Sequence, residues 1–313
     1  MTLLYTDPCF LDHDTGSHPE CAERLRRVNA HLRETGLAPR CELQDVVPVD
    51  PRHLHRVHTE KYAAQVRELS TRGGGRIEAD TVLSERSYDV ALRAAGAACH
   101  AVQRVVRGAA SRALCLVRPP GHHSLSKSAM GFCLFNNVAI AARMAIAKLE
   151  LDRVLIVDWD VHHGNGTQDT FWEDEQVGFL SVHRFPFYPG TGDSDETGSG
   201  PGLGTTLNLP ITFGISRRDY VQKFTTELLH FADKLKPQLI IISAGFDSHR
   251  LDPIGSLGLE VEDFGTLTKA LIDVANDHAE GRLVSVLEGG YNVDILPLCV
   301  AEHLTELLKA DAT

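Results

Sequence analysis

Short runs of apolar residues alternate along the chain with longer segments in which apolar residues recur every three or four positions. A run of four or five apolar residues that ends in Gly, Pro, Asp or His is typical of a strand buried on both faces, whereas the longer spacing is typical of a helix. Their alternation indicates βαβ units, in which crossover helices join parallel strands. The predicted strands are Leu114–Val117, Val154–Val157, Leu239–Ile242 and Leu283–Leu287.

Six segments with helical spacing lie between or beside these strands. Ser216 followed by Asp219 resembles a helix-capping pair, while Pro237 and Gly281 stand where helices are expected to end. With no visible repeat or linker, the pattern predicts one α/β domain over residues 1–313, with a central, mostly parallel sheet flanked by helices. The predicted helices are Glu20–Thr35, Tyr88–Arg107, Val138–Leu149, Asp219–Lys236, Phe264–Ala279 and Asp294–Leu308.

Composition narrows the class of protein. The chain has 31 Lys+Arg and 42 Asp+Glu, and its net charge of −11 excludes a basic nucleic-acid-binding protein. Hydrophobic residues make up 43% of the chain, which is typical of globular proteins. The N-terminus does not resemble a signal peptide, and no apolar run reaches the roughly 18 residues of a membrane-spanning helix. Seven scattered cysteines without a Cys-x-x-Cys pair favour reduced thiols. The sequence therefore predicts a cytoplasmic protein without membrane or nucleic-acid partners.

Chemically reactive residues follow each of the four predicted strands. Ligands of open α/β sheets bind beyond the carboxyl ends of the strands, so a site is expected where these segments meet. In chain order the segments are Arg118–His123, Asp158–Asn165, Ser243–Asp247 and Glu288–Tyr291.

Asp160 and His162 are candidate ligands for a metal ion. Alternation along extended backbone places both on one side, and Asp247, after another strand, is a third candidate. Zinc binds carboxylate oxygen and imidazole nitrogen, and catalytic zinc sites use three protein ligands. An Asp-x-His pair alone is more often a structural hydrogen bond, so the prediction depends on convergence of the strand ends.

Two histidines and a tyrosine are candidates for acid–base chemistry. The imidazoles of His122 and His123 titrate near neutral pH, so either could accept a proton from water beside a metal. Tyr291 follows two glycines and could donate to a developing oxyanion. From these residues alone, two half-buried histidines in a turn and an ordinary packed tyrosine are the alternatives.

Residues 188–205 carry six glycines together with Asp193, Asp195 and Glu196. A phosphate-binding loop is not predicted, because no Gly-Lys-Ser/Thr follows and the local charge is acidic. We expect a mobile surface loop here and a turn at Gly73–Gly75.

Taken together, these motifs resemble the histone deacetylase family of zinc-dependent amidohydrolases, which has the arginase/deacetylase fold. The resemblance spans nearly the whole chain and keeps the family's motif order. Two of the motifs, at His13 and Asp158, resemble the class II branch and its bacterial relatives. The motifs are His13–Gly16, His18–Glu20, Arg118–His123, Gly131–Asn136, Asp158–Gly166, Pro189–Gly192, Ser243–Asp247 and Glu288–Tyr291.

The resemblance implies two bound cations. The zinc ligands would be Asp160, His162 and Asp247. A structural potassium ion nearby would be held by Asp158, Asp160, His162, Ser181 and Val182, in part through backbone oxygens.

The resemblance also implies catalytic roles. His123 would be the general base toward water and then the acid that protonates the departing amine. His122, oriented by Asp158, would act electrostatically, and Tyr291 would hydrogen-bond the acyl carbonyl and the oxyanion. Asn165 stands behind His123 where class I enzymes have an aspartate, so it should raise the pKa of His123 less than a carboxylate would.

By the same resemblance, an acylated lysine of a protein or peptide would enter a tunnel. Phe132, preceded by Gly131, and Tyr188 match its two aromatic walls. Asp80 is a weaker candidate for holding the substrate backbone at the rim. Ile254 stands where acetylpolyamine enzymes have a carboxylate, which favours acyl-lysine.

Three other functions can be compared with lysine deacylation. Ureohydrolases of this fold need further carboxylates for a second metal, but Gly164 and His249 occupy those positions. An acetylpolyamine amidohydrolase stays open because Asp80 and residues 193–196 are acidic. A pseudoenzyme that binds acyl-lysine without turnover is disfavoured, since every expected catalytic position is filled. Acyl-chain length and oligomeric state are left open.

Overall fold

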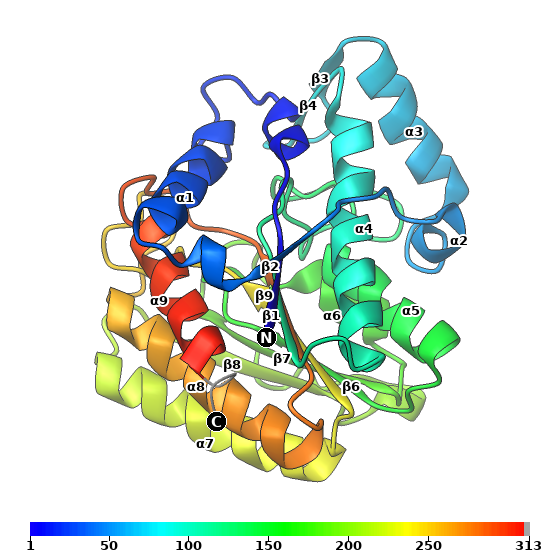
Figure 1. The fold of residues 1–313 in the computed structure, drawn as a ribbon. Coiled ribbons are helices and arrows are strands. Elements are labelled where there is room, and N and C mark those ends of the chain that lie inside the picture. The colour runs from blue at the N-terminus through cyan, green and yellow to red at the C-terminus, as the bar shows by residue number, and fades with distance from the viewer. Residues whose placement is uncertain (310–313) are drawn as a thin grey trace.

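Eight strands form the central sheet of the protein, for which the computed structural model describes residues 1–309 (Figure 1). All strand pairs in this sheet are parallel. The predicted α/β class with a mostly parallel sheet is therefore confirmed. In spatial order the strands are β2 (Glu42–Gln44), β1 (Thr2–Tyr5), β5 (Arg112–Cys115), β10 (Leu283–Leu287), β9 (Leu239–Ala244), β6 (Val154–Asp158), β7 (Val177–Arg184) and β8 (Thr206–Ile211).

The four strands predicted from apolar runs are neighbours in the middle of this sheet. Strands β5, β10, β9 and β6 lie side by side, and every residue in them is buried. Burial on both faces explains why their sequences are continuous apolar runs rather than alternating ones. Because the strands are parallel, the segments that follow them emerge at one edge. Asp158 lies opposite Ser243 in the register, which brings two of these segments together.

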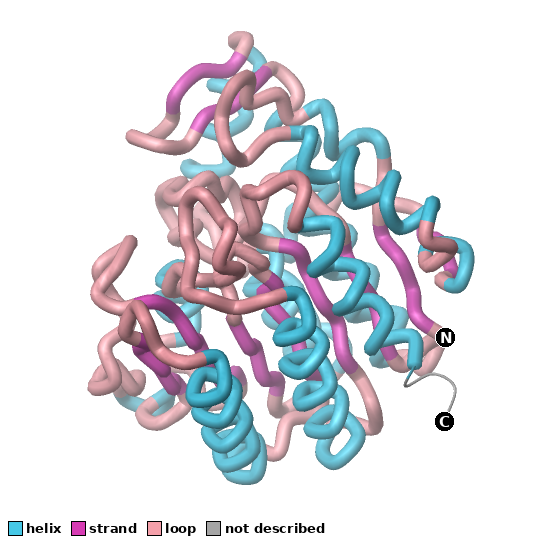
Figure 2. Tube along the Cα trace, turned by 90° about the vertical axis from the view of Figure 1, so that its left-hand side faces the viewer, coloured by secondary structure: helices cyan, strands magenta, loops and turns pink. Residues whose placement is uncertain are grey.

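Helices cover both faces of the sheet, and the loops gather beyond one end of the strands (Figures 1 and 2). Helices α1, α9, α8 and α7 pack in succession on one face, while α4 and α5 pack together on the other. Each predicted helix is present and ends within three residues of its expected limits. They are α1 (Ala22–Glu34), α4 (Ser87–Val106), α5 (Asn137–Leu149), α7 (Arg217–Leu235), α8 (Val261–His278) and α9 (Leu296–Lys309).

The ends of α7 follow from local chemistry. The Ser216 side chain accepts a hydrogen bond from the Asp219 amide and so satisfies one free N–H of the first turn. Lys236 takes a left-handed conformation directly after the helix, and Pro237 cannot continue it. The predicted limits of this helix are thus explained by its capping residues.

A small hairpin stands beside the carboxyl edge of the sheet. Strands β3 (Gly74–Arg76) and β4 (Val82–Ser84) pair antiparallel, so the turn predicted at Gly73–Gly75 is wrong for its last two residues. A side chain at Gly74 would collide with the Leu83 carbonyl group, which explains the glycine. The remaining elements are η1 (Pro8–Asp12), η2 (Ala38–Arg40), α2 (Pro51–Leu54), α3 (Glu60–Thr71), α6 (Asn165–Phe171) and η3 (Gly200–Gly202).

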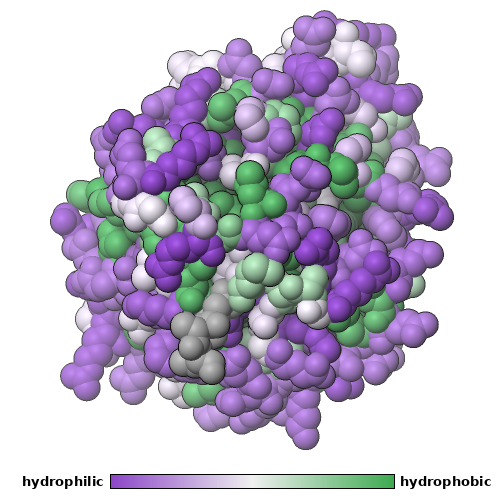
Figure 3. Space-filling model, in the orientation of Figure 1, coloured by the Kyte–Doolittle hydropathy of each residue, from purple (hydrophilic) through white to green (hydrophobic). Residues whose placement is uncertain are grey.

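The visible surface is mainly polar. Polar side chains predominate on the face shown in Figure 3, with apolar ones in separate patches. The seven cysteines are free thiols, as predicted. Within residues 1–309, no helix combines the length and apolarity that a membrane span requires.

Candidate active site

Three buried ligand atoms converge beyond the ends of β6 and β9. They belong to Asp160, His162 and Asp247, and all lie within 4.8 Å of one another. His162 Nδ1 is 3.0 Å from Asp160 Oδ1 and 3.1 Å from Asp247 Oδ2. The structure therefore brings together the three ligands that the sequence predicted.

The electrostatics of this group fit a divalent cation. Burial and the neighbouring Asp160 charge raise the pKa of Asp247 to about 7. Burial alone would lower the pKa of His162, but contacts with both carboxylates raise it to about 10. Among residues 1–309, no group donates a well-formed hydrogen bond to buried Asp247 Oδ2. Two buried carboxylates thus draw positive charge to one point, and with imidazole they form a zinc-type donor set.

Backbone amides orient the two carboxylates. Gly289 N donates to Asp160 Oδ2 at 2.9 Å, and Val161 N donates to Asp247 Oδ1 at 2.9 Å. A side chain at Gly289 would collide with both carboxylates, so glycine is required for this close approach. Such hydrogen bonds fix ligand geometry before a metal arrives.

The two adjacent histidines flank this group. Their ring centroids are 4.0 Å apart, and the His123 ring lies 5.9 Å from that of His162. His122 Nδ1 is 2.9 Å from Asp158 Oδ2, whereas His123 Nδ1 is 2.7 Å from Asn165 Oδ1. One imidazole therefore has an anionic partner and the other a neutral one.

These partners separate the charges of the two histidines. Burial would lower the pKa of His122, but Asp158 and Asp160 raise it to about 10. Burial and the positive charges of His122 and His162 lower the pKa of His123 well below its usual value. His122 is consequently cationic and His123 neutral at pH 7, the division that acid–base catalysis by a histidine pair needs.

Tyr291 reaches the same point from the loop after β10. Gly290 takes a φ of +117°, which only glycine adopts readily, and Tyr291 N donates to Asp252 Oδ2 at 2.7 Å. The ring packs edge-on against Phe132 at 5.6 Å, and the Arg24 guanidinium lies 5.0 Å from its centroid. Burial and the nearby ligand carboxylates raise the pKa of Tyr291, so its hydroxyl remains a hydrogen-bond donor.

One cavity of about 210 Å³ opens onto these groups. All five residues predicted to bind substrate line this cavity, together with three candidate catalytic or metal-binding residues and Phe187. Tyr188 is 38% exposed at its mouth. The lining residues are Asp80, His123, Gly131, Phe132, His162, Phe187, Tyr188, Ile254 and Tyr291.

Phe187 is a wall residue that the sequence reasoning missed. Its ring stacks on the His162 imidazole, with centroids 5.4 Å apart and planes inclined by 15°. Tyr188 instead approaches His123 edge-on at 5.3 Å. Adjacent residues reach the same cavity because residues 185–189 are not a strand, so side chains need not alternate.

The rim residue Asp80 is held against the Phe132 wall. Thr81 Oγ1 donates to Asp80 Oδ1 at 2.9 Å and accepts from Phe132 N at 3.0 Å. The Asp80 carbonyl oxygen lies 3.1 Å from His18 Nε2. Burial and the Glu78 carboxyl group raise the pKa of Asp80. The hairpin loop and the aromatic wall thus form one packed unit.

Comparison with known proteins agrees with this geometry. The family model of the histone deacetylase domain matches residues 18–307. The chain belongs to the histone deacetylase family. It is 39% identical over 291 residues to a probable deacetylase of Archaeoglobus fulgidus, covering 91% of this chain and 80% of the relative. It is 38% identical over 293 residues to a histone deacetylase-like amidohydrolase of Pseudomonas aeruginosa, with coverages of 93% and 77%.

A solved structure supports the same assignment. The crystal structure of the HDA15 HD domain matches with a TM-score of 0.94 and 36% identity, over 100% of this chain and 89% of that chain. The predicted family and fold are confirmed, and with them a hydrolase of the deacetylase type.

The five residues predicted for a potassium ion lie on two segments of this deacetylase-family domain, the end of β6 with the loop that follows it and the middle of β7. Asp158 pairs directly with Ser181 in the register of β6 and β7, and Val182 follows on β7. Asp160 N donates to Asp158 Oδ1 at 3.0 Å, and Ser181 Oγ lies 2.9 Å from His183 Nδ1. All five residues are buried, and two of them, Asp160 and His162, also belong to the zinc-type ligand group.

A second buried group of candidate ligands has a structural explanation. The ligand atoms of His122, Cys133 and Glu288 lie within 4.8 Å of one another. However, Glu288 Oε2 already accepts from Gly121 N at 2.6 Å and His122 N at 3.2 Å. Burial raises the pKa of Glu288 to about 7. This carboxyl group holds the loop that carries His122 and His123 in place.

The glycine-rich segment is anchored to the domain rather than extending from the rim. Glu196 accepts from Gly192 N at 3.1 Å and from Gln168 Nε2 at 2.5 Å, and Gln168 contacts His163 Nε2 at 3.0 Å. We expected a mobile surface loop here, and residues 193–195 are exposed, but Glu196 is partly buried because its carboxylate accepts these hydrogen bonds. Asp193 remains exposed.

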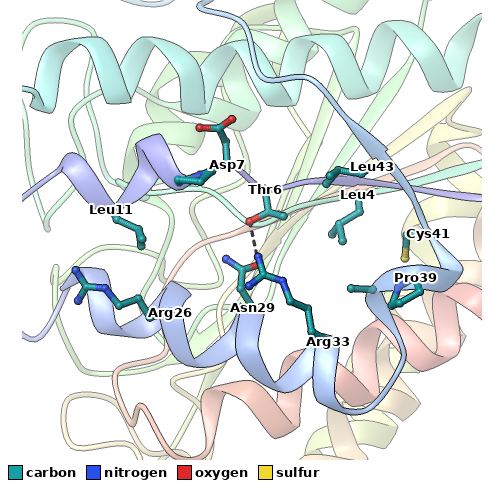
Figure 4. A pocket seen from close by; sticks show the side chains of 12 residues that line it. Leu4, Thr6, Asp7, Leu11, Arg26, Asn29, Arg33, Pro39, Cys41 and Leu43 are labelled. Atoms are coloured by element: carbon teal, nitrogen blue, oxygen red, sulfur yellow. Dashed lines mark hydrogen bonds between the residues drawn. The ribbon is translucent and has the colours of Figure 1, made fainter.

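A wider cavity, of about 590 Å³, lies between α1 and the β1–β2 edge of the sheet (Figure 4). Its lining contains one carboxylate, Asp7, and no histidine. Asp7 Oδ1 accepts from Cys9 N at 2.8 Å, so it caps η1. The candidate active site is therefore assigned to the smaller cavity, because that cavity is lined by the candidate metal ligand His162 and this larger one by none of the candidate ligands.

A buried ion-pair network contacts the loop that carries Glu288 and Tyr291. Glu20 accepts from Arg118 Nη2 at 2.8 Å and Arg24 Nη1 at 3.0 Å. Arg24 also donates to the carbonyl oxygens of Glu288 and Gly290, each at 2.6 Å. The network thereby ties α1 to the loop that carries the catalytic tyrosine candidate.

Glu20→Gln should destabilise the protein by about 3–5 kcal/mol, because it leaves two buried guanidinium groups short of negative charge. Burial would raise the pKa of Glu20, but Arg118 and Arg24 hold it well below the ordinary 4.5. Its contribution is therefore present above pH 4.5 and is lost as the pH falls below that value. Urea unfolding at pH 7 and at decreasing pH measures both effects.

The matched control is Glu23→Gln in the first turn of α1, three residues along the chain from Glu20. Glu23 forms an exposed pair with Arg26, and such pairs contribute about 0–1 kcal/mol. Equal losses of stability in the two variants would contradict the role assigned to the buried network.

Proposed function

We propose that the protein is a zinc-dependent lysine deacylase that removes acetyl or other acyl groups from the side-chain amine of lysine in proteins or peptides. The observation that carries this proposal is the position of neutral His123 and Tyr291 beside the ligand group of Asp160, His162 and Asp247. The proposal treats residues 1–313 as one catalytic domain that acts in the cytoplasm.

Asp160, His162 and Asp247 would hold the zinc ion. When bound, zinc polarises the acyl carbonyl group and lowers the pKa of a water molecule. The potassium ion would be held by Asp158, Ser181 and backbone oxygens nearby, where it would fix the strand ends that carry the zinc ligands.

His123 would transfer a proton from the attacking water to the departing lysine amine. Its Nδ1 contacts the Asn165 amide oxygen, which assigns the hydrogen to Nδ1 and leaves the Nε2 lone pair free. Nε2 can then accept a proton from the attacking water and return it to the departing lysine amine. The depressed pKa of His123 keeps it neutral before the reaction.

His122 and Tyr291 would stabilise the negative charge that develops on the acyl oxygen. His122 is held positive by Asp158, and Tyr291 presents a neutral hydroxyl donor. Donors fixed before the reaction need no reorganisation as charge develops, which lowers the barrier.

The cavity walls favour an acyl-lysine substrate. Phe132, Phe187 and Tyr188 offer apolar faces to the methylene stem of lysine, and Asp80 can accept a hydrogen bond from the substrate backbone. Ile254 adds an apolar wall where a second ammonium group would need a carboxylate. An acetylpolyamine remains the second candidate, because Asp80 is a carboxylate at the mouth.

A substrate panel tests this choice. The kcat/KM for an acetyl-lysine peptide should exceed that for an acetylated diamine by about tenfold or more, because a pocket without a partner for the second ammonium loses a charged contact. Ile254→Glu should raise diamine turnover, and Ile254→Gln, without the charge, should not. Turnover of the diamine alone by the parent enzyme would overturn lysine specificity. Zinc binding without turnover of any acyl amide would indicate a binding protein.

A further inference from the structure

Arg184, the last residue of β7, connects two walls of the cavity. Its Nη1 donates to the Gly255 carbonyl oxygen at 3.0 Å. The guanidinium carbon lies 4.2 Å from the centroid of Phe187 and 4.4 Å from that of Phe213. Its backbone amide donates to the Val161 carbonyl oxygen at 2.9 Å. One side chain thus joins three loops at the carboxyl edge of the sheet.

Two of the side-chain contacts of Arg184 lead to walls of the cavity. Phe187 stacks on His162 and forms one wall. Gly255 follows Ile254, which forms another wall. Asp252 holds this second wall from its far side, since its Oδ1 accepts from Ile254 N at 2.9 Å and Gly255 N at 3.0 Å.

Arginine suits this position for a physical reason. A planar guanidinium can stack on aromatic rings while its N–H groups donate in the plane, whereas a lysine ammonium cannot do both with one geometry. Among residues 1–309, no carboxylate forms an ion pair with Arg184. Its charge is therefore directed to the two rings and the Gly255 carbonyl group.

We propose that Arg184 is a positioning residue that sets the spacing between the Phe187 wall and the Ile254 wall, and so determines how tightly the acyl-lysine stem is held. This inference rests on the proposed function. Arg184 does not line the cavity and touches none of the proposed proton-transfer groups. Its loss should therefore weaken substrate binding more than the chemical step.

The test compares Arg184→Met and Arg184→Lys with the parent enzyme on an acetyl-lysine peptide. Methionine keeps an unbranched stem but removes the charge and the donors, so KM should rise about tenfold with kcat changed less than about threefold. Lysine restores the charge and should recover part of the loss in KM. Zinc content and thermal midpoint should stay close to those of the parent enzyme.

Arg282→Met is the matched control. Arg282 is also half-buried and donates to a backbone carbonyl group, that of Gln238, but it lies at the opposite end of the strands. Its KM should equal that of the parent enzyme.

Two results would overturn the inference: an unchanged KM in Arg184→Met, or a fall in kcat without a rise in KM. If Arg184→Met does not fold, Phe213→Leu serves instead, because Phe213 is 60% exposed and contacts the same guanidinium. It should raise KM in the same direction, and an unchanged KM would count against the inference. If the parent enzyme did not hydrolyse the acetyl-lysine peptide at all, that result would contradict the proposed function rather than the role of Arg184.

Discussion

Asp247→Ala should lose zinc and hydrolysis together. Asp247 supplies one of two buried carboxylates at the proposed metal position, and without it His162 and Asp160 offer two ligands where catalytic zinc sites use three. Metal chemistry contributes several kcal/mol of transition-state stabilisation, so the expected fall in kcat/KM is about 10³-fold or more. Elemental analysis of the purified variant and a continuous deacetylation assay measure the two losses on one sample.

The control for this variant is Asp193→Ala. Asp193 is exposed and its carboxylate accepts hydrogen bonds from the neighbouring Ser194, so zinc content and rate should match the parent enzyme. Full activity in Asp247→Ala would exclude this ligand assignment. Activity lost with zinc fully retained would exclude it as well.

Tyr291→Phe should keep the zinc and lose most of the rate. The substitution removes one hydroxyl from a ring that stays packed against Phe132 and Arg24. Removal of a single oxyanion donor costs about 10²–10³-fold in kcat, so we expect a loss of that size with little change in KM. Steady-state kinetics with a zinc measurement on the same preparation give the answer.

Tyr88→Phe provides the comparison for Tyr291→Phe. Tyr88 lies on α4 and packs edge-on against Phe135, away from the cavity, so its loss of a hydroxyl should leave kcat unchanged. If Tyr291→Phe were as active as the parent enzyme, the oxyanion donor would have to be another group. A large rise in KM with an unchanged kcat would assign Tyr291 to binding instead.

The sequence predicted the centre of the fold better than its edges. Strands β5, β10, β9 and β6 are buried on both faces, so their apolar runs are continuous and easy to recognise. Strand β7 is also buried, but Ser181 and His183 interrupt its apolar pattern because they form polar contacts beside the site. Strand β1 and the edge strand β2 next to it are short, and β2 is only partly buried. Their positions depend on tertiary packing rather than on local pattern.

In the candidate site, too, some residues could be predicted from the sequence and others could not. Residues directly after the central strands could be predicted because parallel strands bring their ends together. Phe187, Arg184 and Arg24 could not, since their positions depend on loop conformation and on side chains that meet across distant segments. Glu196 lies in the glycine-rich segment that was predicted to be a mobile surface loop, but its carboxylate accepts hydrogen bonds from Gly192 N and Gln168 Nε2. The composition of a segment does not reveal such partners.

Zinc titration of metal-depleted enzyme tests the central claim most directly. The protein is stripped with a chelator, Zn²⁺ is added back in fractions of an equivalent, and hydrolysis of an acetyl-lysine peptide is measured at each step. We expect no hydrolysis by the stripped enzyme and a linear recovery that stops at one zinc per chain, because one group of three ligands holds the ion. Hydrolysis by the fully stripped enzyme, or recovery that requires two zinc ions per chain, would contradict the account.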